Sequence, residues 1–268
     1  MTTTSPDTAF RRLRILTYNI HSCRGTDGRS DPARIAETIA RCEPDIIALQ
    51  EVDVGRKRTG GVDQAQMVAA HLKLASYFHP ALHLETEQYG DAILTGLPTK
   101  VIHAAPLPSI GEPRGAIWVA VDLGGATLNV FNTHLGLRRR ERIRQVTSLV
   151  GPEWLGNAGC RDAPTILLGD FNAVPSSMPY KMLARHGQDA LAHAGVRVRP
   201  TFPSRLPLLR LDHIFVSGGV KAVHAEVVAD RKTRTASDHL PLLATVDVPV
   251  PAGNKKAGTT KAPAETVE

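Results

Sequence analysis

Short apolar segments rich in β-branched and aromatic residues recur along the chain and predict a series of buried strands. We expect these strands at residues 13–20, 45–49, 76–79, 91–95, 100–107, 114–122, 127–134, 165–168, 211–217 and 240–248. The segments 114–122 and 127–134 are joined at Gly124 and Gly125, which predicts a hairpin. Helices are expected at residues 33–40, 64–72, 138–150 and 178–186. The first two follow Asp31 and Asp63, whose side chains are suited to N-caps.

Six of the predicted strands end beside polar residues that are able to bind ions or transfer protons. These residues are Asn19, Glu51, His134, Asp170 with Asn172, Asp212 with His213, and Asp238 with His239 just before the last strand. Ligand sites in α/β sheets collect outside the ends of strands. If these strand ends share one edge, the chain therefore has a single site with several carboxylates, histidines and carboxamides.

The segment at residues 164–175, P-T-I-L-L-G-D-F-N-A-V-P, is the most informative of these. Asp170 and Asn172 follow a buried strand and stand two residues apart, so in extended chain they point to the same side. The carboxylate can hold a metal or a water, and the carboxamide can hydrogen-bond a phosphoryl oxygen. Seen alone, the segment fits a strand-to-loop turn equally well, because Asp and Asn are common turn residues.

The other polar strand ends also have plain structural interpretations when each is considered alone. Asn19 fits a turn, Glu51 fits a solvated strand end, and a single histidine such as His134 is more often structural than a ligand. Asp212-His213 and Asp238-His239 each fit a local turn. Their occurrence together in one chain favours a functional site.

The composition is that of an ordinary globular protein and argues against several other classes. A chain of 268 residues, 42% of them hydrophobic, suits one domain with a core of normal size. No apolar run approaches the roughly 18 residues that span a bilayer, and the N-terminus lacks the apolar region of a signal peptide. Cys23, Cys42 and Cys160 predict neither a disulfide framework nor a structural zinc site. We expect a cytoplasmic protein, since free cysteines fit a reducing compartment, and we expect it to be a monomer.

The sequence shows no internal repeat and no linker, so residues 13–248 are expected to form a single domain. Residues 1–12 are polar and are expected to be a flexible N-terminus. Residues 249–268 consist mostly of Ala, Gly, Lys, Pro and Thr, which predicts a disordered tail. The net charge of +6 is compatible with a polyanionic partner, although part of it lies in this tail.

Eight segments in sequence resemble the endonuclease/exonuclease/phosphatase superfamily of metal-dependent phosphoesterases. They are T-Y-N-I-H (17–21), L-Q-E-V (49–52), Y-G-D-A-I-L (89–94), E-P-R-G-A (112–116), N-T-H-L-G (132–136), G-D-F-N-A (169–173), L-D-H-I-F-V-S (211–217) and S-D-H-L-P-L (237–242). Each segment alone is a weak signal, and the eight together cover nearly the whole domain. The resemblance implies an α/β fold with four layers (α/β/β/α), in which two mixed β-sheets pack face to face between helices.

The resemblance also implies a catalytic role for each residue that falls on a family motif. Glu51 is expected to be the main ligand of a catalytic Mg²⁺, which Mn²⁺ is able to replace, with help from Asn19 and Asp238. Asp170 is expected to orient or deprotonate the attacking water, and Asn172 to hold a phosphoryl oxygen. His239 is expected beside the phosphate and oriented by Asp212, while His134 is the second histidine at the phosphate or the leaving oxygen.

Three further residues are expected to contact the substrate. Arg114 falls where relatives carry an arginine that contacts phosphate, although a surface ion pair is the plain alternative. His21 belongs to a subset of relatives that have the N-I-H form. Asp91 departs from the pattern because many relatives have Asn there, and its carboxylate is expected to pair with His134 or to add metal affinity.

The resemblance predicts a hydrolase that acts on phosphodiester bonds but leaves the substrate open. DNA, as for an endonuclease or exonuclease, is one candidate, and phospholipid head groups or other small phosphate esters are the alternative. The basic runs at 57–58 and 138–140 are able to contact a nucleic-acid backbone, but solvated faces are the favoured interpretation. Aromatic residues for base stacking are few. A zinc enzyme and an inactive binding protein on the same fold are less favoured, since the expected ligands are carboxylates and amides and every catalytic position is filled.

Overall fold

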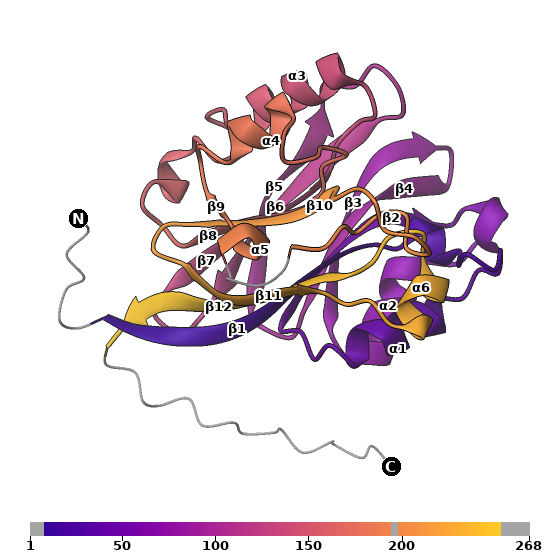
Figure 1. Cartoon of the computed structure of the whole chain (residues 1–268), viewed down its shortest axis with the longest axis horizontal. Coiled ribbons are helices and arrows are strands. Elements are labelled where there is room, and N and C mark those ends of the chain that lie inside the picture. Colours follow the sequence, from indigo (N-terminus) through magenta and orange to yellow (C-terminus); the bar gives the residue numbers. More distant parts are fainter. Residues whose placement is uncertain (1–7, 194–197, 253–268) are drawn as a thin grey trace, which may run out of the picture.

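The computed structural model describes residues 8–193 and 198–252, and its strands form two six-stranded sheets that pack face to face (Figure 1). The first sheet has the order β11-β12-β1-β2-β4-β3 and the second β5-β6-β7-β8-β10-β9. Each sheet contains one parallel pair, β1 with β2 and β7 with β8, and its other neighbouring strands are antiparallel. The strands are β1 (Thr8–Asn19), β2 (Ile46–Val54), β3 (Ala75–Leu84), β4 (Glu87–Thr95), β5 (Thr99–Leu107), β6 (Arg114–Asp122), β7 (Thr127–His134), β8 (Thr165–Asp170), β9 (Gln188–Asp189), β10 (Asp212–Ser217), β11 (Lys221–Val227) and β12 (Leu242–Pro251).

Helices cover the outer faces of the two sheets and complete the predicted four-layer sandwich. In Figure 1 the helices α1 (Pro32–Ala40), α2 (Gln64–Leu72) and α6 (Arg231–Ala236) lie together beside the first sheet. The helices α3 (Arg139–Leu149) and α4 (Met178–Leu183) lie beside the second sheet, and the short α5 (Ala190–His193) follows β9. As predicted, the side chains of Asp31 and Asp63 cap α1 and α2 by accepting hydrogen bonds from backbone N–H groups.

Three apolar clusters hold these layers together. The central cluster fills the space between the sheets, and two outer clusters fill the spaces between each sheet and its helices. The alternation along β1 shows how the sequence produces this arrangement, because Ile15 belongs to the central cluster and Leu16 to the outer one. Successive side chains of a strand point to opposite faces, so a continuous apolar run is needed where both faces are covered.

Both ends of the predicted domain extend further than expected. Strand β1 begins at Thr8, so residues 8–12 are not a flexible terminus, and β12 continues to Pro251. The two strands pair from Thr8↔Pro251 onward, and Arg12 forms an ion pair with Asp247 at 2.8 Å. The polar residues of this region were predicted to be loose, but alternate polar positions are expected on a strand with one exposed face. The remaining residues of the predicted terminus and tail, 1–7 and 253–268, lie outside the described residues.

Strand β2 continues through the site that was predicted to end it. Gln50 and Glu51 were predicted to follow the strand, and residues 52–62 were predicted to form a loop. The strand instead runs to Val54, and its register with β4 shifts between Leu49 and Val52. This irregularity is a bulge, which places an extra residue in one strand and turns a side chain out of the regular alternation. Strand β11 and helix α6 were not predicted, since neither has a clear apolar period.

A pair of buried amides joins the two sheets below the predicted site. Gln50 of β2 donates from Nε2 to Oδ1 of Asn132 on β7 at 2.8 Å. Asn132 in turn donates from Nδ2 to the carbonyl oxygens of Leu49 and Ala92 in the first sheet, at 2.9 Å each. Both side chains are fully buried. A buried polar group is costly unless it is hydrogen-bonded, so these contacts favour one relative position of the two sheets.

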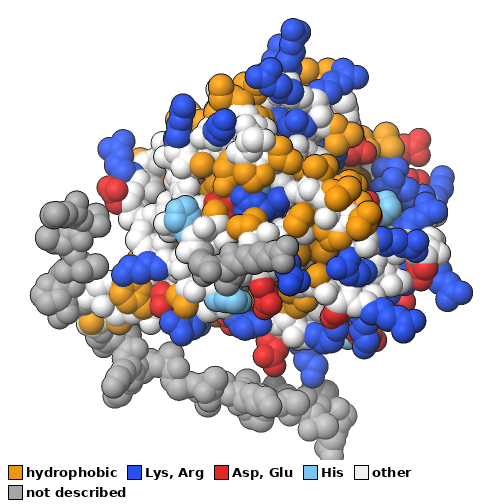
Figure 2. All heavy atoms as spheres, viewed as in Figure 1, with side chains coloured by type: hydrophobic (Ala, Val, Ile, Leu, Met, Phe, Trp, Pro, Cys, Tyr) orange, Lys and Arg blue, Asp and Glu red, His pale blue; other side chains and the backbone are white. Residues whose placement is uncertain are grey.

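The charged surface of the molecule is mixed in sign. Figure 2 shows Lys and Arg side chains scattered over one face, with Asp and Glu side chains among them. Arg138, Arg139 and Arg140 are exposed, as predicted for a solvated run. In the described residues, no helix is both long enough and apolar enough to cross a membrane.

The amide pair generates a prediction for stability. Replacing Asn132 with Ala removes the side-chain donor to the buried carbonyl groups of Leu49 and Ala92 and the acceptor of one hydrogen bond from Gln50. We expect the free energy of unfolding to fall by about 2–4 kcal/mol, since an unpaired buried group costs about 1–3 kcal/mol. Urea unfolding followed by circular dichroism measures this. Thr127→Ala, on the exposed start of the same strand, is the control, and an equal loss in both variants would contradict the proposed role.

Candidate active site

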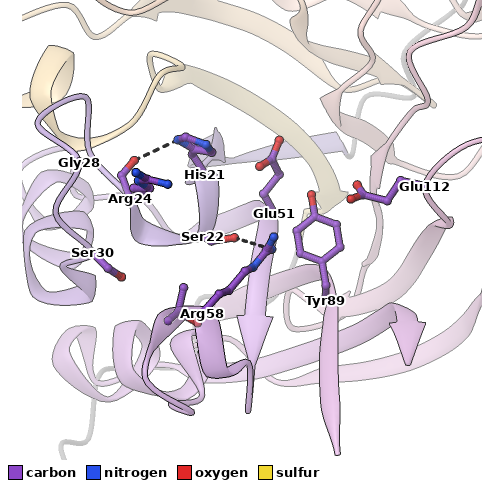
Figure 3. A pocket seen from close by; sticks show the side chains of 10 residues that line it. His21, Ser22, Arg24, Gly28, Ser30, Glu51, Arg58, Tyr89 and Glu112 are labelled. Carbon is purple, nitrogen blue, oxygen red and sulfur yellow. Dashed lines mark hydrogen bonds between the residues drawn. The ribbon is translucent and has the colours of Figure 1, made fainter. Parts of the chain in front are cut away.

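Glu51 reaches a cleft at one end of the two sheets because of the bulge in β2. Its backbone φ of 59° lies in the left-handed region, which is uncommon for a residue other than glycine. Figure 3 shows the Glu51 carboxylate pointing into the cleft between His21 and Tyr89. The cleft has a volume of about 570 Å³. Asn172 and His21 also have positive φ values, of 46° and 48°, so three of the predicted site residues occupy strained backbone positions.

Asn19 holds the carboxylates of the two sheets together. Its Nδ2 donates to Oε1 of Glu51 at 2.9 Å and to Oδ2 of Asp170 at 3.0 Å. Its Oδ1 accepts from the backbone N–H of His21 at 3.0 Å. In this arrangement the nitrogen of Asn19 faces both carboxylates, so Asn19 positions Glu51 and Asp170 directly.

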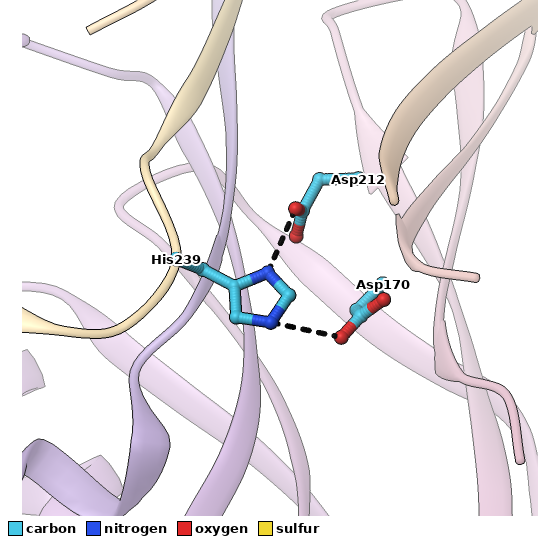
Figure 4. Close-up of side chains that lie close together, drawn as sticks. All are labelled: Asp170, Asp212 and His239. Atoms are coloured by element: carbon cyan, nitrogen blue, oxygen red, sulfur yellow. Dashed lines mark hydrogen bonds and ion pairs between the residues drawn. The ribbon is translucent and has the colours of Figure 1, made fainter. Parts of the chain in front are cut away.

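His239 lies between two aspartates, as Figure 4 shows. Its Nδ1 is 2.9 Å from Oδ2 of Asp212, and its Nε2 is 3.5 Å from Oδ2 of Asp170. Asp212 is fully buried and comes from β10, which pairs Asp212 directly with Asp170 on β8. The adjacent His213 points to the opposite face of β10, where it contacts the backbone carbonyl of Ala173. Only the first residue of the predicted Asp212-His213 pair therefore reaches the site.

His134 and Asn172 form a second group beside Asp170. Nε2 of His134 is 3.4 Å from Oδ2 of Asp170 and 3.0 Å from Nδ2 of Asn172. On the other side of the ring, Arg114 donates from Nη1 to Nδ1 of His134 at 3.1 Å. Since a guanidinium only donates, Nδ1 must accept, and the proton of the neutral ring lies on Nε2. Arg114 is buried rather than on the surface, and it also pairs with Glu112 at 2.7 Å.

Asp91 is buried behind this second group. Burial raises the pKa of its carboxyl to about 8, and the negative charges of Glu51 and Asp170 add to the rise, whereas Arg114 and a hydrogen bond from the backbone N–H of His134 oppose it. The predicted pairing of Asp91 with His134 thus involves the backbone of His134, because the imidazole ring is held by Arg114.

The two histidines differ in charge because they have different neighbours. Burial lowers the pKa of His134 well below its usual value, and the positive charges of Arg114 and His239 lower it further. Burial also acts to lower the pKa of His239, but the carboxylates of Asp212 and Asp170 outweigh it and raise the pKa to about 10. At neutral pH His134 is therefore neutral and His239 is an imidazolium.

The carboxylates of the site repel one another. Burial raises the pKa of Glu51, and the charges of Asp238 and Asp170 add to it. Burial likewise raises the pKa of Asp170, with His239 opposing the shift and Asp212 adding to it. Asp238 is half-exposed at the rim, where Oδ1 is 3.7 Å from Nδ1 of His21. With the exception of His213, the structure thus brings together the residues predicted for the site.

Several residues of the site were not predicted from the sequence. Tyr89 and Glu112 line the cleft, and Ser237 donates from Oγ to the backbone carbonyl of Asn19 at 2.8 Å. Arg58 was assigned to a solvated basic run, but its guanidinium is bonded to the buried carboxylate of Asp53. Tyr89, Glu112 and Ser237 lie inside segments that matched the superfamily. Arg58 gave no such signal, because its partner is recognisable only in the folded chain.

A model of the endonuclease/exonuclease/phosphatase family matches residues 16–239. The chain belongs to this family. It is a hydrolase that acts on phosphate ester bonds, as the members of the endonuclease/exonuclease/phosphatase family are. Among curated proteins, it is 30% identical over 248 residues to the uncharacterised protein YbhP of Escherichia coli (strain K12), a match that covers 87% of this chain and 96% of YbhP.

Solved structures of the endonuclease/exonuclease/phosphatase family share the fold. The crystal structure of a family member from Beutenbergia cavernae is 23% identical, with a TM-score of 0.72, over 89% of this chain and 72% of that one. A mannosyl-6-phosphatase of Bacteroides thetaiotaomicron is 21% identical, with a TM-score of 0.67, over 87% of this chain and 99% of that one. These likenesses confirm the predicted two-sheet sandwich.

The donor set of the site fits a hard divalent cation of the kind on which the endonuclease/exonuclease/phosphatase family generally depends. Glu51, Asp170 and Asp238 supply carboxylate oxygens whose repulsion a cation would relieve, and Oδ1 of Asp212 is buried without a hydrogen-bond partner among the described residues. Atoms of Asp170, Asp212 and His239 also lie within 4.8 Å of one another. Because His239 bonds to Asp212 and carries a positive charge, its ring is not suited to bind an ion.

The raised pKa of His239 generates a prediction for pH dependence. A pKa of about 10 in the folded protein exceeds the unfolded value of about 6.5, so the charged ring stabilises the fold. This contribution is fully present below about pH 6.5 and is lost as pH rises through about 10. In Asp212→Asn we expect the pKa of His239 to fall by at least one unit, as measured by NMR titration of the ring. Asp122→Asn, at an exposed position, is the control, and an unchanged titration of His239 would refute the assignment.

Proposed function

We propose that the protein is a Mg²⁺-dependent phosphodiesterase that cleaves its substrate by direct attack of water on phosphorus. The observation that carries this proposal is the charged His239 held between Asp212 and Asp170, beside the carboxylate of Glu51. A positively charged hydrogen-bond donor, a proton acceptor and a set of carboxylates that could bind a metal are thus close together in one site. These are the groups that stabilise charge in phosphoryl transfer.

Asp170 is the residue suited to receive the proton of the attacking water. Its raised pKa makes it a better base than an exposed aspartate, and its Oδ2 faces the Nε2 atoms of both His134 and His239. The backbone N–H of Asn172 donates to its other oxygen at 2.9 Å. This bond fixes the orientation of the carboxylate, so that Oδ2 is the atom presented to a water.

Two donors are suited to the oxygens of the phosphoryl group. The imidazolium of His239 can donate from Nε2 to an oxygen on which negative charge develops. The neutral ring of His134 carries its proton on Nε2, next to the amide nitrogen of Asn172, so these two side chains present donors side by side. A second phosphoryl oxygen could accept hydrogen bonds from both His134 and Asn172. We therefore infer direct hydrolysis, with no covalent enzyme intermediate.

Glu51 and Asp238 are the residues proposed to hold Mg²⁺, with Asn19 keeping Glu51 in place. When bound, the metal would neutralise charge on the phosphoryl oxygens and hold the substrate in position.

DNA and small phosphate esters remain the two substrate candidates. The family name includes both nucleases and phosphatases, and one solved relative is a mannosyl-6-phosphatase. The cleft of about 570 Å³ and the mixed charge of the surface favour a small ester or a short part of a polymer. A catalytically dead binding protein is disfavoured because every proposed catalytic side chain is present and in contact with another. A cytoplasmic monomer stays a prediction.

The first test is Mg²⁺-dependent turnover on supercoiled plasmid, an abasic duplex, sphingomyelin, glycerophospho-diesters and an inositol polyphosphate. We expect hydrolysis of at least one substrate, with EDTA abolishing it. His239→Ala and Asp170→Ala should each reduce kcat by at least a hundredfold, because both groups act on the reacting atoms. His71→Ala, at an exposed helix position, is the matched control. Near-normal turnover in either site variant would refute the assigned roles, and inactivity on all substrates would favour the binding protein.

The metal assignment has a separate test that does not require a substrate. Isothermal titration calorimetry of the purified protein with MgCl₂ should detect binding that Glu51→Gln weakens by at least tenfold, since the variant loses the principal anionic ligand. Glu112→Gln removes a carboxylate from the same cleft that is already paired with Arg114, so its affinity for Mg²⁺ should change much less. Equal losses in both variants would argue against Glu51 as the principal ligand. Tighter binding and higher activity with Zn²⁺ would overturn the choice of metal.

A further inference from the structure

The part of the cleft beyond Glu51 contains two arginines that the proposed mechanism does not use. Arg24 and Arg58 line the cleft together with Glu51, and Figure 3 shows Arg24 beside His21 and Arg58 below Glu51. Both follow site strands closely, since Arg24 ends the short 3-10 helix His21–Cys23 after β1 and Arg58 lies in the 3-10 helix Lys57–Thr59 after β2. Their position next to the proposed metal ligand suggests a contact with the same substrate molecule.

Arg58 is held rigidly by groups behind it. Its Nε and Nη2 bond to the two carboxylate oxygens of Asp53 at 2.7 Å each, and Asp53 is fully buried. Nη2 also donates to Oγ of Ser22 at 3.1 Å, and the guanidinium lies 5.3 Å from the centre of the Tyr89 ring. Among the described residues, Nη1 has no acceptor. A bidentate pair of this kind fixes the plane of the guanidinium, so the free Nη1 is presented in a defined direction.

Arg24 is held through its backbone and leaves its charge free. Its backbone N–H donates to the carbonyl of His21 at 2.8 Å, and its own carbonyl contacts Nδ1 of His21 at 3.1 Å. Arg24 also forms an isolated bridge with Ser30 across the loop. Within the described part of the chain, no carboxylate pairs with its guanidinium.

The acidic groups of the cleft have other partners. Glu51 is bonded to Asn19 and is the proposed metal ligand, while Glu112 is paired with Arg114 at 2.7 Å. Arg24 and Nη1 of Arg58 therefore remain as donors without an acceptor, next to the hydroxyl groups of Ser22 and Ser30. Asp53 already pairs with two nitrogens of Arg58, so the free donors are Nη1 of Arg58 and the guanidinium of Arg24. Guanidinium donors that point into a concave site suit an anionic ligand.

We propose that Arg24 and Arg58 bind a second phosphoryl group of the substrate, next to the phosphate that is hydrolysed. This inference rests on the proposed function and specifies the substrate class as esters that carry at least two phosphates. Guanidinium groups match phosphate oxygens in geometry and stay charged at all relevant pH values. The second phosphate has two possible sources, the adjacent linkage of a polynucleotide or a terminal phosphate of a small ester.

The experiment compares substrates that carry one phosphate with substrates that carry two. Bis(4-nitrophenyl) phosphate has one phosphate, a dinucleotide without or with a 5′-phosphate tests the polynucleotide source, and a hexose monophosphate against a hexose bisphosphate tests the small ester. For Arg24→Gln we expect kcat/KM to fall about tenfold on the two-phosphate substrates, mainly through KM, and to change less than twofold on the others. Losing one charge-assisted hydrogen bond accounts for about a tenfold change.

A second site variant allows the test to be made if Arg24→Gln folds poorly, and a third variant is the control. Arg58→Lys retains a positive charge beside the buried Asp53 but loses the free Nη1, so it should show the same selective loss. Arg29→Gln removes an exposed charge from the same loop as Arg24, outside the cleft, and is the matched control. Equal kcat/KM ratios between two-phosphate and one-phosphate substrates in wild type and all variants would overturn the inference.

A binding measurement separates failure of this inference from failure of the proposed function. Inorganic phosphate is titrated without Mg²⁺, and binding is followed by NMR of the arginine Nε–H signals. Arg24→Gln should weaken phosphate binding about tenfold, whereas Arg29→Gln should not. If the wild type is inactive on all substrates but this difference is found, the anion site stands and the proposed reaction falls. If phosphate affinity is the same in Arg24→Gln and wild type, the anion site falls.

Discussion

The buried contact between Gln50 and Asn132 is the constraint on which the position of the site depends. Gln50 immediately precedes Glu51, and Asn132 stands two residues before His134, so each amide is within two residues of a proposed catalytic or metal-binding side chain from its own sheet. An apolar interface alone would tolerate small slides of one sheet on the other, because the hydrophobic effect is not directional. Hydrogen bonds between buried amides are directional, and a slide would leave them unpaired.

Strained backbone conformations then orient the site side chains at the end of the sheets whose relative position this contact fixes. His21, Glu51 and Asn172 all have positive φ values, and such conformations persist only where the surroundings support them. The support is visible for two of them, since the N–H of His21 donates to Asn19 and the N–H of Asn172 donates to Asp170. The residues that stabilise the strained backbone are thus the same residues that hold the carboxylates.

Most strands, and the position of polar residues at their ends, could be predicted from the sequence because these features depend on local patterns. The sequence also predicted that Asp212 and His239 belong together, through the resemblance of their segments to a known family. It did not predict that His213 points away, because that depends on the phase of β10 relative to the central core. Nor could it predict the bond of Arg58 to Asp53, which requires the turn of residues 55–57 to bring the two side chains face to face.

Charge balance explains why one site combines several carboxylates with several positively charged side chains. Glu51, Asp170, Asp212 and Asp238 together favour a cation, yet a phosphate ester is itself an anion and is repelled by the same carboxylates. The structure places positive groups among and beside these carboxylates. His239 lies between Asp212 and Asp170, Arg114 contacts His134, and Arg24 and Arg58 line the cleft together with Glu51. A substrate bound beside these groups would have part of its negative charge compensated, while a bound cation would be held by the carboxylates. The neutral state of His134 fits this balance, because a third cation next to Arg114 would be repelled by it.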